Sequence, residues 1–229
     1  MFFLWDPTYI LLIPALILSI YASVKVRSAF NYFSKIPNSK GITGREAAEI
    51  ILRSLGLYDV KIEPIPGTLT DHYDPRAKVL RLSQSVHSSP SIAAVGVAAH
   101  EIGHAVQDAT GYYALVLRSS LVPIANIGTQ LAFPLFLLGF IFGSSGLMNV
   151  GILAFSVAVL FYIVTLPVEY NASKRARELL LSTGIVSTQE AEGVKKVLNA
   201  AALTYLAAAL TALLNLFRLI LLANMRNRN

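Results

Sequence analysis

Long uncharged stretches alternate with charged segments along this chain, and they predict membrane-spanning helices. Residues 8–24 carry no charged side chain and just reach the roughly 17–25 residues that a bilayer crossing requires. Residues 119–168 contain no Asp, Glu, Lys or Arg, which is enough for two spans of about 20 residues each. The Gly-Ser-Ser-Gly sequence at 143–146 indicates a turn, so we expect a helical hairpin of spans 121–142 and 147–166.

A further apolar segment at 200–223 belongs to a long final helix that Thr188 opens. It can be a fourth span, although it contains Arg218. The terminal Arg226 and Arg228 would then lie outside, against the tendency of positive residues to stay in the cytoplasm. A helix packed along the membrane surface is the alternative.

Charge around the first span predicts its orientation. A cleaved signal peptide is the alternative, but it would have positive charge before the apolar core and small residues at its end. Here an acidic residue, Asp6, precedes the core, and the basic residues Lys25, Arg27, Lys35 and Lys40 follow it. We therefore expect a retained anchor with its N-terminus outside and the following segment in the cytoplasm.

Most of the charge lies in residues 27–118, which we expect to form a soluble-facing unit. The T-x-x-E pattern at 43–46 is a capping box and predicts a helix over 44–55. The alternating segments that follow predict a strand at 60–62 and a hairpin within 67–82.

The composition agrees with an integral membrane protein. The 229 residues are 55% hydrophobic and only 14% charged, against about 25% charged in globular domains, and the mean hydropathy is +0.59. Cysteine is absent, which excludes disulfides, Cys-ligated zinc and thiol catalysis. The net charge of +6 fits a positive-inside bias, and no basic stripe with interleaved aromatics indicates nucleic-acid binding.

Residues 100–104 read HEIGH and match the His-Glu-x-x-His pattern. On a helix, His100 and His104 project to the same side, with the spacing that two nitrogen ligands of one Zn²⁺ require. Glu101 points about 100° away, beside the metal and not onto it, where it can take a proton from the attacking water. A chance match is the alternative, but burying these three residues in an Ala/Val/Ile helix would be costly without partners.

The expected limits of this helix come from local signals. Ser89 is a candidate N-cap with Pro90 at the first helical position, and Gly111 lies just beyond the expected end.

A catalytic zinc site needs a third protein ligand. Outside the motif only His72 and His87 remain as histidines, so a carboxylate is favoured. Asp108 lies one turn after His104 on the same face of the helix. Because it points in the same direction as the two histidines, it cannot easily complete a tetrahedral site with them. Glu169 is better placed, because the uncharged hairpin returns the chain to the side it left; an interfacial charge that ends a span is the alternative.

The hairpin turn offers two more candidates. His72 and Tyr73 can reach the site and donate hydrogen bonds to a developing oxyanion. The alternative is a turn held by the side chains of Asp71 and Asp74.

These residues lie in motifs that resemble a known family. The segment 67–107 contains T-D-H-Y-D-P, L-x-L-S and A-A-H-E-I-G-H-A-V-Q, and E-Y-N-A-S-K-R-A and A-A-A-L-T-Y-L-A-A-A-L follow later. Over nearly the whole chain it is similar to the bacterial membrane-bound neutral zinc metallopeptidases and, more distantly, to membrane gluzincins of the heat-shock and CAAX-processing type. The distant relatives place an Asp four residues after the ligand Glu, where this chain has Ser173.

The resemblance implies a Zn²⁺ endopeptidase with one ion per chain, His100, His104 and Glu169 as ligands and Glu101 as base. The expected fold is a mainly α-helical multi-pass membrane protein with a small α+β zincin-like catalytic unit. Expected partners are the lipid bilayer and a peptide or membrane-protein substrate that binds the hairpin by strand addition. We expect the cytoplasmic membrane as the location, with the active site facing the cytoplasm.

Two other functions stay open. One is a non-enzymatic assembly or adaptor protein with a structural zinc site; the other is an intramembrane-cleaving protease, which would need the His-Glu helix to lie in the bilayer. The sequence leaves the oligomeric state open. The expected division is an anchor at 1–26, a zinc peptidase unit at 27–118, a transmembrane hairpin at 119–168, a third-ligand helix and linker at 169–198, and a C-terminal membrane helix at 199–229.

Overall fold

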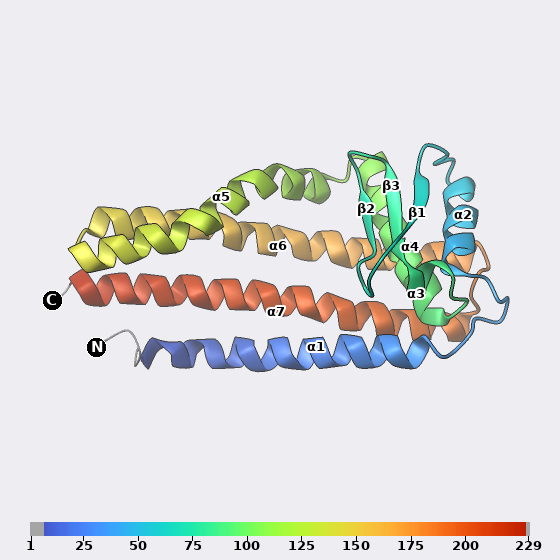
Figure 1. Ribbon diagram of the computed structural model, residues 1–229, viewed down its shortest axis with the longest axis horizontal. Helices are drawn as coiled ribbons and strands as arrows, with labels where there is room; N and C mark the ends of the chain where they lie inside the picture. The colour runs from blue at the N-terminus through green and yellow to red at the C-terminus, as the bar shows by residue number, and fades with distance from the viewer. Residues whose placement is uncertain (1–6, 228–229) are drawn as a thin grey trace. The chain divides into compact units, whose positions relative to one another are not determined.

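The computed structural model describes residues 7–227 and contains four helices that are long and apolar enough to cross a membrane (Figure 1). Asp6 and Arg228, which enter the topology argument above, lie outside the described residues. The first helix begins as the 3₁₀ helix η1 (Pro7–Leu12) and continues as α1 (Ile13–Phe33). The other three are α5 (Tyr113–Phe142), α6 (Ser145–Ser182) and α7 (Thr188–Asn227).

The predicted turn between the second and third apolar helices is confirmed. Helix α5 ends at Phe142 and α6 begins at Ser145, and Gly143 adopts a φ of +68°, which glycine reaches without steric cost. The four helices extend beyond the predicted apolar stretches, and α6 continues unbroken through the charged residues after 168. Pro123 and Pro134 lie inside α5 and Pro167 lies inside α6, which membrane helices tolerate.

The chain forms two compact units. The first, which we call the helical unit, comprises residues up to 22, 116–166 and the residues from 204 onward. The second, the mixed unit, comprises residues 23–115 and 167–203. Helices α1, α6 and α7 therefore contribute residues to both units.

Small residues bring α5 and α6 together in the helical unit. A Cβ on Gly128 would lie 2.6 Å from the carbonyl oxygen of Ala154, and one on Gly151 would lie 2.7 Å from that of Ala132. Such contacts are typical of membrane helix pairs, where small residues let backbones approach closely.

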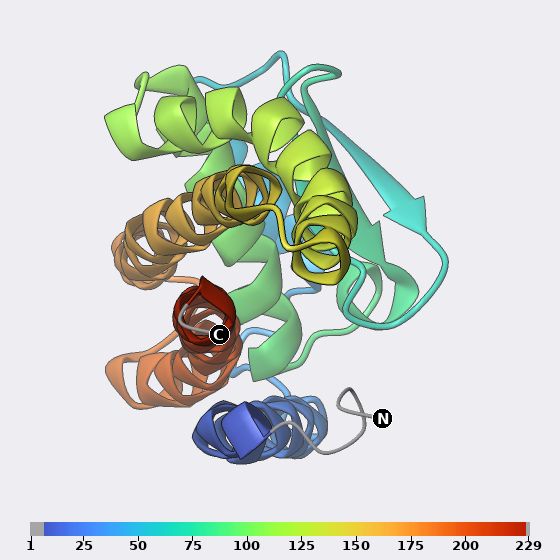
Figure 2. The same ribbon diagram turned by 90° about the vertical axis from the view of Figure 1, so that its left-hand side faces the viewer.

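Helix α7 lies between α6 and α1 in both ribbon views (Figure 1, Figure 2). Arg218 of α7 donates from Nε to the Thr8 hydroxyl at 3.0 Å, and its Cζ lies 3.8 Å from the centre of the Tyr9 ring. The charge inside the predicted fourth span thus has partners within the helical unit, as charged groups at such depths require.

The mixed unit contains a three-stranded sheet and the helix that carries the HEIGH motif. The sheet has the order β1-β3-β2, with β1 parallel and β2 antiparallel to β3. The predicted strand and hairpin are both present. The elements are α2 (Gly44–Ser54), β1 (Lys61–Ile65), β2 (His72–Asp74), β3 (Val79–Ser83), α3 (Gln84–His87) and α4 (Ile92–Ala109).

Helix α4 forms the centre of the hydrophobic core of the mixed unit. Its buried small residues, such as Ala94 and Ala98, belong to one hydrophobic core with Ile51 of α2 and with Leu80 and Leu82 of β3. The capping box at the start of α2 is confirmed, because Thr43 accepts from the Glu46 backbone and Glu46 accepts from the Thr43 backbone.

The predicted start of the HEIGH helix was wrong by two residues. Ser91, not Ser89, is the N-cap, and its hydroxyl accepts from the Ala94 backbone at 3.2 Å. The carbonyl of Pro90 instead accepts from the backbone N–H of Asn38 at 2.9 Å, a long-range contact that keeps Pro90 outside the helix. The short helix α3 between the hairpin and α4 was not predicted.

Candidate metal centre

Helix α4 presents two imidazole rings on one face. His100 and His104 are one turn apart, their ring centres are 4.8 Å apart, and the rings are nearly perpendicular at 85°. Both side chains are only 13% exposed. The i, i+4 spacing in the sequence therefore yields the predicted juxtaposition.

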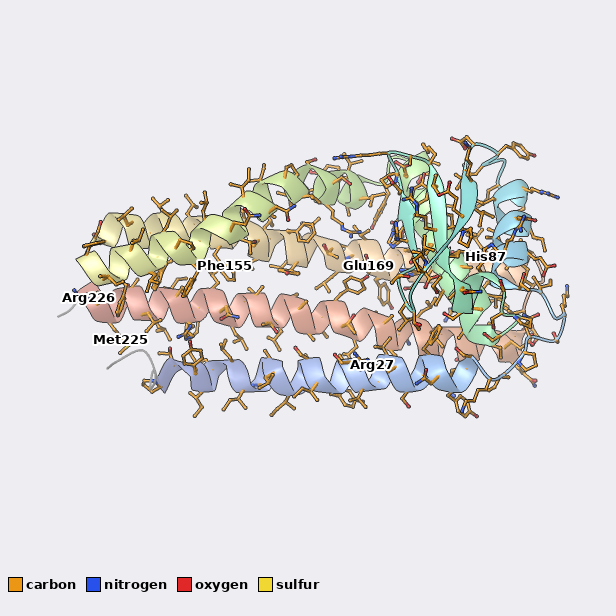
Figure 3. The ribbon with its side chains drawn as sticks, in the orientation of Figure 1. Arg27, His87, Phe155, Glu169, Met225 and Arg226 are labelled. Carbon is orange, nitrogen blue, oxygen red and sulfur yellow. The ribbon has the colours of Figure 1, made fainter. Side chains whose placement is uncertain are left out.

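Glu169 comes to this pair from α6 (Figure 3). Its side chain is 4% exposed, and its Oε2 lies 3.3 Å from the Nε2 of His100 and 3.6 Å from the Nε2 of His104. The donor atoms of the three residues all lie within 4.8 Å of one another. All three predicted ligands belong to the mixed unit.

The close approach of α6 to α4 depends on Gly103, the fourth residue of the motif. A Cβ there would lie 2.6 Å from the carbonyl oxygen of Ala172 and 3.0 Å from its Cα. Ala172 and Ala176 are fully buried, and their small side chains allow α6 to pack closely against α4. Glu169 lies one turn before Ala172, so this contact positions its carboxylate.

The donor set fits Zn²⁺. Two imidazole nitrogens and a carboxylate oxygen are ligands that zinc takes in catalytic sites. Bonds of about 2.0–2.1 Å in a tetrahedron separate neighbouring ligand atoms by about 3.3 Å. The distances of 3.3 and 3.6 Å from Glu169 Oε2 to the Nε2 atoms of His100 and His104 are close to this value. Direct charge-assisted hydrogen bonds would be shorter, at about 2.7–2.9 Å.

Gln107 orients His104, a role that the sequence reasoning missed. Its amide nitrogen donates to the Val168 carbonyl at 2.8 Å and to Asn171 Oδ1 at 3.0 Å, so its oxygen faces the Nδ1 of His104 at 3.0 Å. An amide oxygen only accepts, so Nδ1 donates, and the Nε2 of the neutral ring keeps its lone pair on the side of Glu169. The i, i+3 spacing to His104 was a signal that could have identified Gln107.

Ser173 holds the other histidine. Its hydroxyl lies 3.1 Å from the Nδ1 of His100, at the position where the distant relatives place an Asp. A hydroxyl can donate or accept, so Ser173 fixes the ring less strictly than Gln107 fixes that of His104.

The candidate base, Glu101, is buried next to the histidines. Its Oε2 accepts from the backbone N–H of Tyr73 at 3.1 Å. Burial raises the pKa of Glu101; His100 and His104 lower it, but less strongly, and Glu169 raises it further. Burial lowers the pKa of His104, but the Glu169 and Glu101 carboxylates outweigh this effect and raise it.

The hairpin residues His72 and Tyr73 take different positions. Tyr73 reaches Glu101 through its backbone, and its hydroxyl donates to Asp108 at 2.9 Å. His72 is exposed, with its Nδ1 2.9 Å from the carbonyl oxygen of Thr70. Asp71 accepts from both the backbone and the hydroxyl of Ser83, so side-chain support of the turn is also present.

The other residues considered as ligands lie outside this group. Asp108 is engaged by the Tyr73 hydroxyl and by Lys78, whose Nζ lies 3.1 Å away. The ring of His87 lies 3.1 Å from the hydroxyl of Ser88. Among residues 7–227, the metal-binding group comprises only His100, His104 and Glu169.

Comparison with known proteins identifies the family. Residues 8–224 match the model of a family described as "Putative neutral zinc metallopeptidase". The chain belongs to this family. The resemblance inferred from the sequence motifs is thereby confirmed, and a zinc ligand set of two histidines and a glutamate agrees with the family description.

A curated relative of this zinc metallopeptidase family comes from Bacillus subtilis strain 168 and is named "Putative membrane protease YugP". It is 50% identical over 220 residues, which cover 96% of this chain and 98% of the relative. No solved structure matches the chain.

Proposed function

We propose that the chain is a membrane-bound, zinc-dependent endopeptidase that hydrolyses peptide bonds at the cytoplasmic face of the membrane. The observation that carries the proposal is the convergence of His100, His104 and Glu169 with the buried carboxylate of Glu101 beside them. The four apolar helices support the membrane location, and the basic residues after the first span support the cytoplasmic orientation.

His100, His104 and Glu169 would hold the ion through two imidazole nitrogens and one carboxylate oxygen, and Gln107 and Ser173 orient the two rings. A Zn²⁺ bound here would supply Lewis-acid polarisation of the scissile carbonyl and lower the pKa of the attacking water. Among residues 7–227, three protein groups converge here, which is the number of protein ligands in catalytic zinc sites. A purely structural zinc site would have four protein ligands.

Glu101 takes the proton of the attacking water and then passes it to the leaving amine. The Tyr73 backbone N–H holds one carboxylate oxygen, which fixes the direction of the group. Because burial raises the pKa of Glu101, the carboxylate is a stronger base than an exposed glutamate.

The position of strand β2 supports the proposal that the substrate is a peptide. It lies at the edge of the sheet, and its Tyr73 contacts Glu101, so an extended peptide added alongside β2 would pass the base. The roles of His72 and Tyr73 as donors to the developing oxyanion stay predictions from the sequence; loss of such a donor would reduce turnover by about 10²–10³-fold. In this structure the Nδ1 of His72 donates to the Thr70 carbonyl and the Tyr73 hydroxyl donates to Asp108, so either donor would have to turn towards the substrate. Turnover that is unchanged in a folded His72→Ala protein would remove His72 from the reaction.

The deciding experiment compares metal content with hydrolysis. Glu101→Gln should keep about one zinc per chain and lose hydrolysis of an unfolded substrate, because the base is not a ligand. Glu169→Ala should lose both zinc and hydrolysis, whereas Glu178→Ala on an exposed turn of the same helix should lose neither. An active Glu101→Gln protein would contradict the mechanism, and full zinc in Glu169→Ala would contradict the ligand set.

A further inference from the structure

Helices α6 and α7 enclose a second polar site in the mixed unit. The two helices run side by side (Figure 1, Figure 2), and between them lies a cavity of about 380 Å³. One face of α6 lines it with Tyr170, Lys174 and Arg177, and one face of α7 lines it with Lys195 and Asn199. None of the described residues that line this cavity is acidic.

The positive charge of this cavity is only weakly compensated. Lys174 pairs with Glu178 at 3.9 Å and Lys195 with Glu192 at 3.3 Å, and these are exposed pairs of the kind that contribute little to stability. The half-buried Arg177 has no hydrogen bond or ion pair with any of the described residues. Because no described residue engages this guanidinium, it is available to bind an anion in a bidentate manner.

The cavity residues lie where two predicted spans leave the hydrocarbon. On α6, residues 170–177 follow the uncharged stretch that ends at Val168, with Glu169 between them. On α7, residues 195–199 directly precede the apolar stretch that begins at Ala200. Tyr170 is 71% exposed, and tyrosine is enriched at the headgroup level of membrane proteins. Basic pockets between membrane helices bind the headgroups of anionic lipids.

We propose that this cavity binds the phosphate of an anionic phospholipid headgroup. Arg177 and Lys195 contribute opposed cations from the two helices, Lys174 adds a third, and the Asn199 amide can donate to a phosphate oxygen. The hydroxyl of Ser173, which also lines the cavity, is already engaged by His100 and is not needed as a donor. This assignment rests on the membrane location of the proposed function, but not on its chemistry.

The test measures lipid binding to the full chain in neutral detergent by native mass spectrometry, with phosphatidylglycerol against phosphatidylcholine. The native protein should prefer phosphatidylglycerol by roughly tenfold or more, and Arg177→Gln with Lys195→Gln should lose this preference. The matched control is Arg53→Gln with Lys196→Gln, which removes the same net charge from exposed residues outside the cavity. It should retain the preference.

Three outcomes would overturn the proposal: no preference in the native protein, equal loss in the cavity and control variants, or displacement of the lipid by inorganic phosphate at about 10 mM. The last outcome would assign the cavity to free phosphate. Zinc content is measured in parallel and should be unchanged in both variants. If the double variant fails to fold, Lys174→Gln with Asn199→Ala, at two exposed positions of the same cavity, is compared with Lys196→Gln alone, which also removes one positive charge. A failure of lipid binding with normal zinc and hydrolysis would leave the proposed peptidase intact.

Discussion

The two histidines of the candidate metal centre are held by side chains of different chemistry, and this difference has measurable consequences. Gln107 is completely buried, and its bonds to Val168 and Asn171 determine which amide atom faces His104. Ser173, by contrast, can rotate its hydroxyl and bond His100 as donor or acceptor. The protein therefore determines the tautomer of His104, whereas Ser173 is compatible with either tautomer of His100.

Gln107→Ala should consequently weaken zinc binding more than Ser173→Ala. Loss of an orienting partner of a ligand histidine typically costs about 10–100-fold in metal affinity, and we expect Gln107→Ala in the upper part of this range. Competition with a zinc chelator, followed by zinc content per chain, measures both affinities. Equal losses in the two variants would contradict the idea that Gln107 fixes the ring of His104.

A second prediction at this scale concerns the stability of the metal-free protein. Burial raises the pKa of Glu101, so the folded protein binds this proton more tightly than the unfolded chain. Its contribution to stability is therefore full below the unfolded pKa of about 4.3 and is lost as the pH rises through the raised folded value. Replacing Glu101 by a neutral residue should remove this loss of stability at neutral pH.

Metal-free Glu101→Gln should accordingly unfold at a higher temperature than the metal-free native protein at neutral pH. The unfolding temperature should rise by about 2–4 °C for each kcal/mol of added stability. The difference between the two proteins should shrink as the pH is lowered towards 5. Thermal unfolding in detergent with a chelator, at several pH values, gives both quantities. A lower unfolding temperature for the variant at pH 7 would show that ionised Glu101 stabilises the fold.

At the scale of elements, the close contact between α4 and α6 carries Glu169 to the histidines. Gly103→Ala would place a methyl group 2.6 Å from the Ala172 carbonyl oxygen. This oxygen belongs to the backbone of α6, which cannot move away as a flexible side chain can. Overpacking of this kind costs about 1–3 kcal/mol. The variant should lose zinc affinity by roughly tenfold or more, together with a lower unfolding temperature.

Gly146→Ala is the matched control for this change. Its new Cβ would lie 3.9 Å from the nearest side-chain atom, the Ser144 hydroxyl, which is an ordinary contact. It should bind zinc like the native protein. Normal zinc affinity in Gly103→Ala would mean that α6 does not need this contact to present Glu169.

Local signals were sufficient to predict several elements and part of the site. The capping box at Thr43, the turn at Gly143 and the i, i+4 pair of histidines each depend on a few neighbouring residues. The N-cap at Ser91 was missed because local signals favoured Ser89, with Pro90 as the first helical residue. The contact of Pro90 with Asn38, which is distant in the sequence, excludes that start. The role of Gln107 was missed for the same reason, since its partners lie on another helix.

At the scale of the whole molecule, the order of segments in the chain differs from their grouping in space. The sequence suggested contiguous segments with limits such as 27–118 and 119–168. The structure groups discontinuous ones, because α1, α6 and α7 each contribute to the helical and the mixed unit. Composition identifies an apolar run, but it does not show that one helix continues past the end of that run into a different core.

The last prediction concerns how the chain crosses the membrane. Lys25, Arg27, Lys35 and Lys40 follow the first span, so the mixed unit should face the cytoplasm and the turn between α5 and α6 should lie outside. The native chain has no cysteine, so single cysteines report without background. In intact cells, an impermeant thiol reagent should label Ser145→Cys but not Lys40→Cys, two exposed positions. After permeabilisation both should be labelled equally, which controls for access to the thiol. Labelling of both positions in intact cells, or of Lys40→Cys alone, would contradict the cytoplasmic orientation of the metal centre.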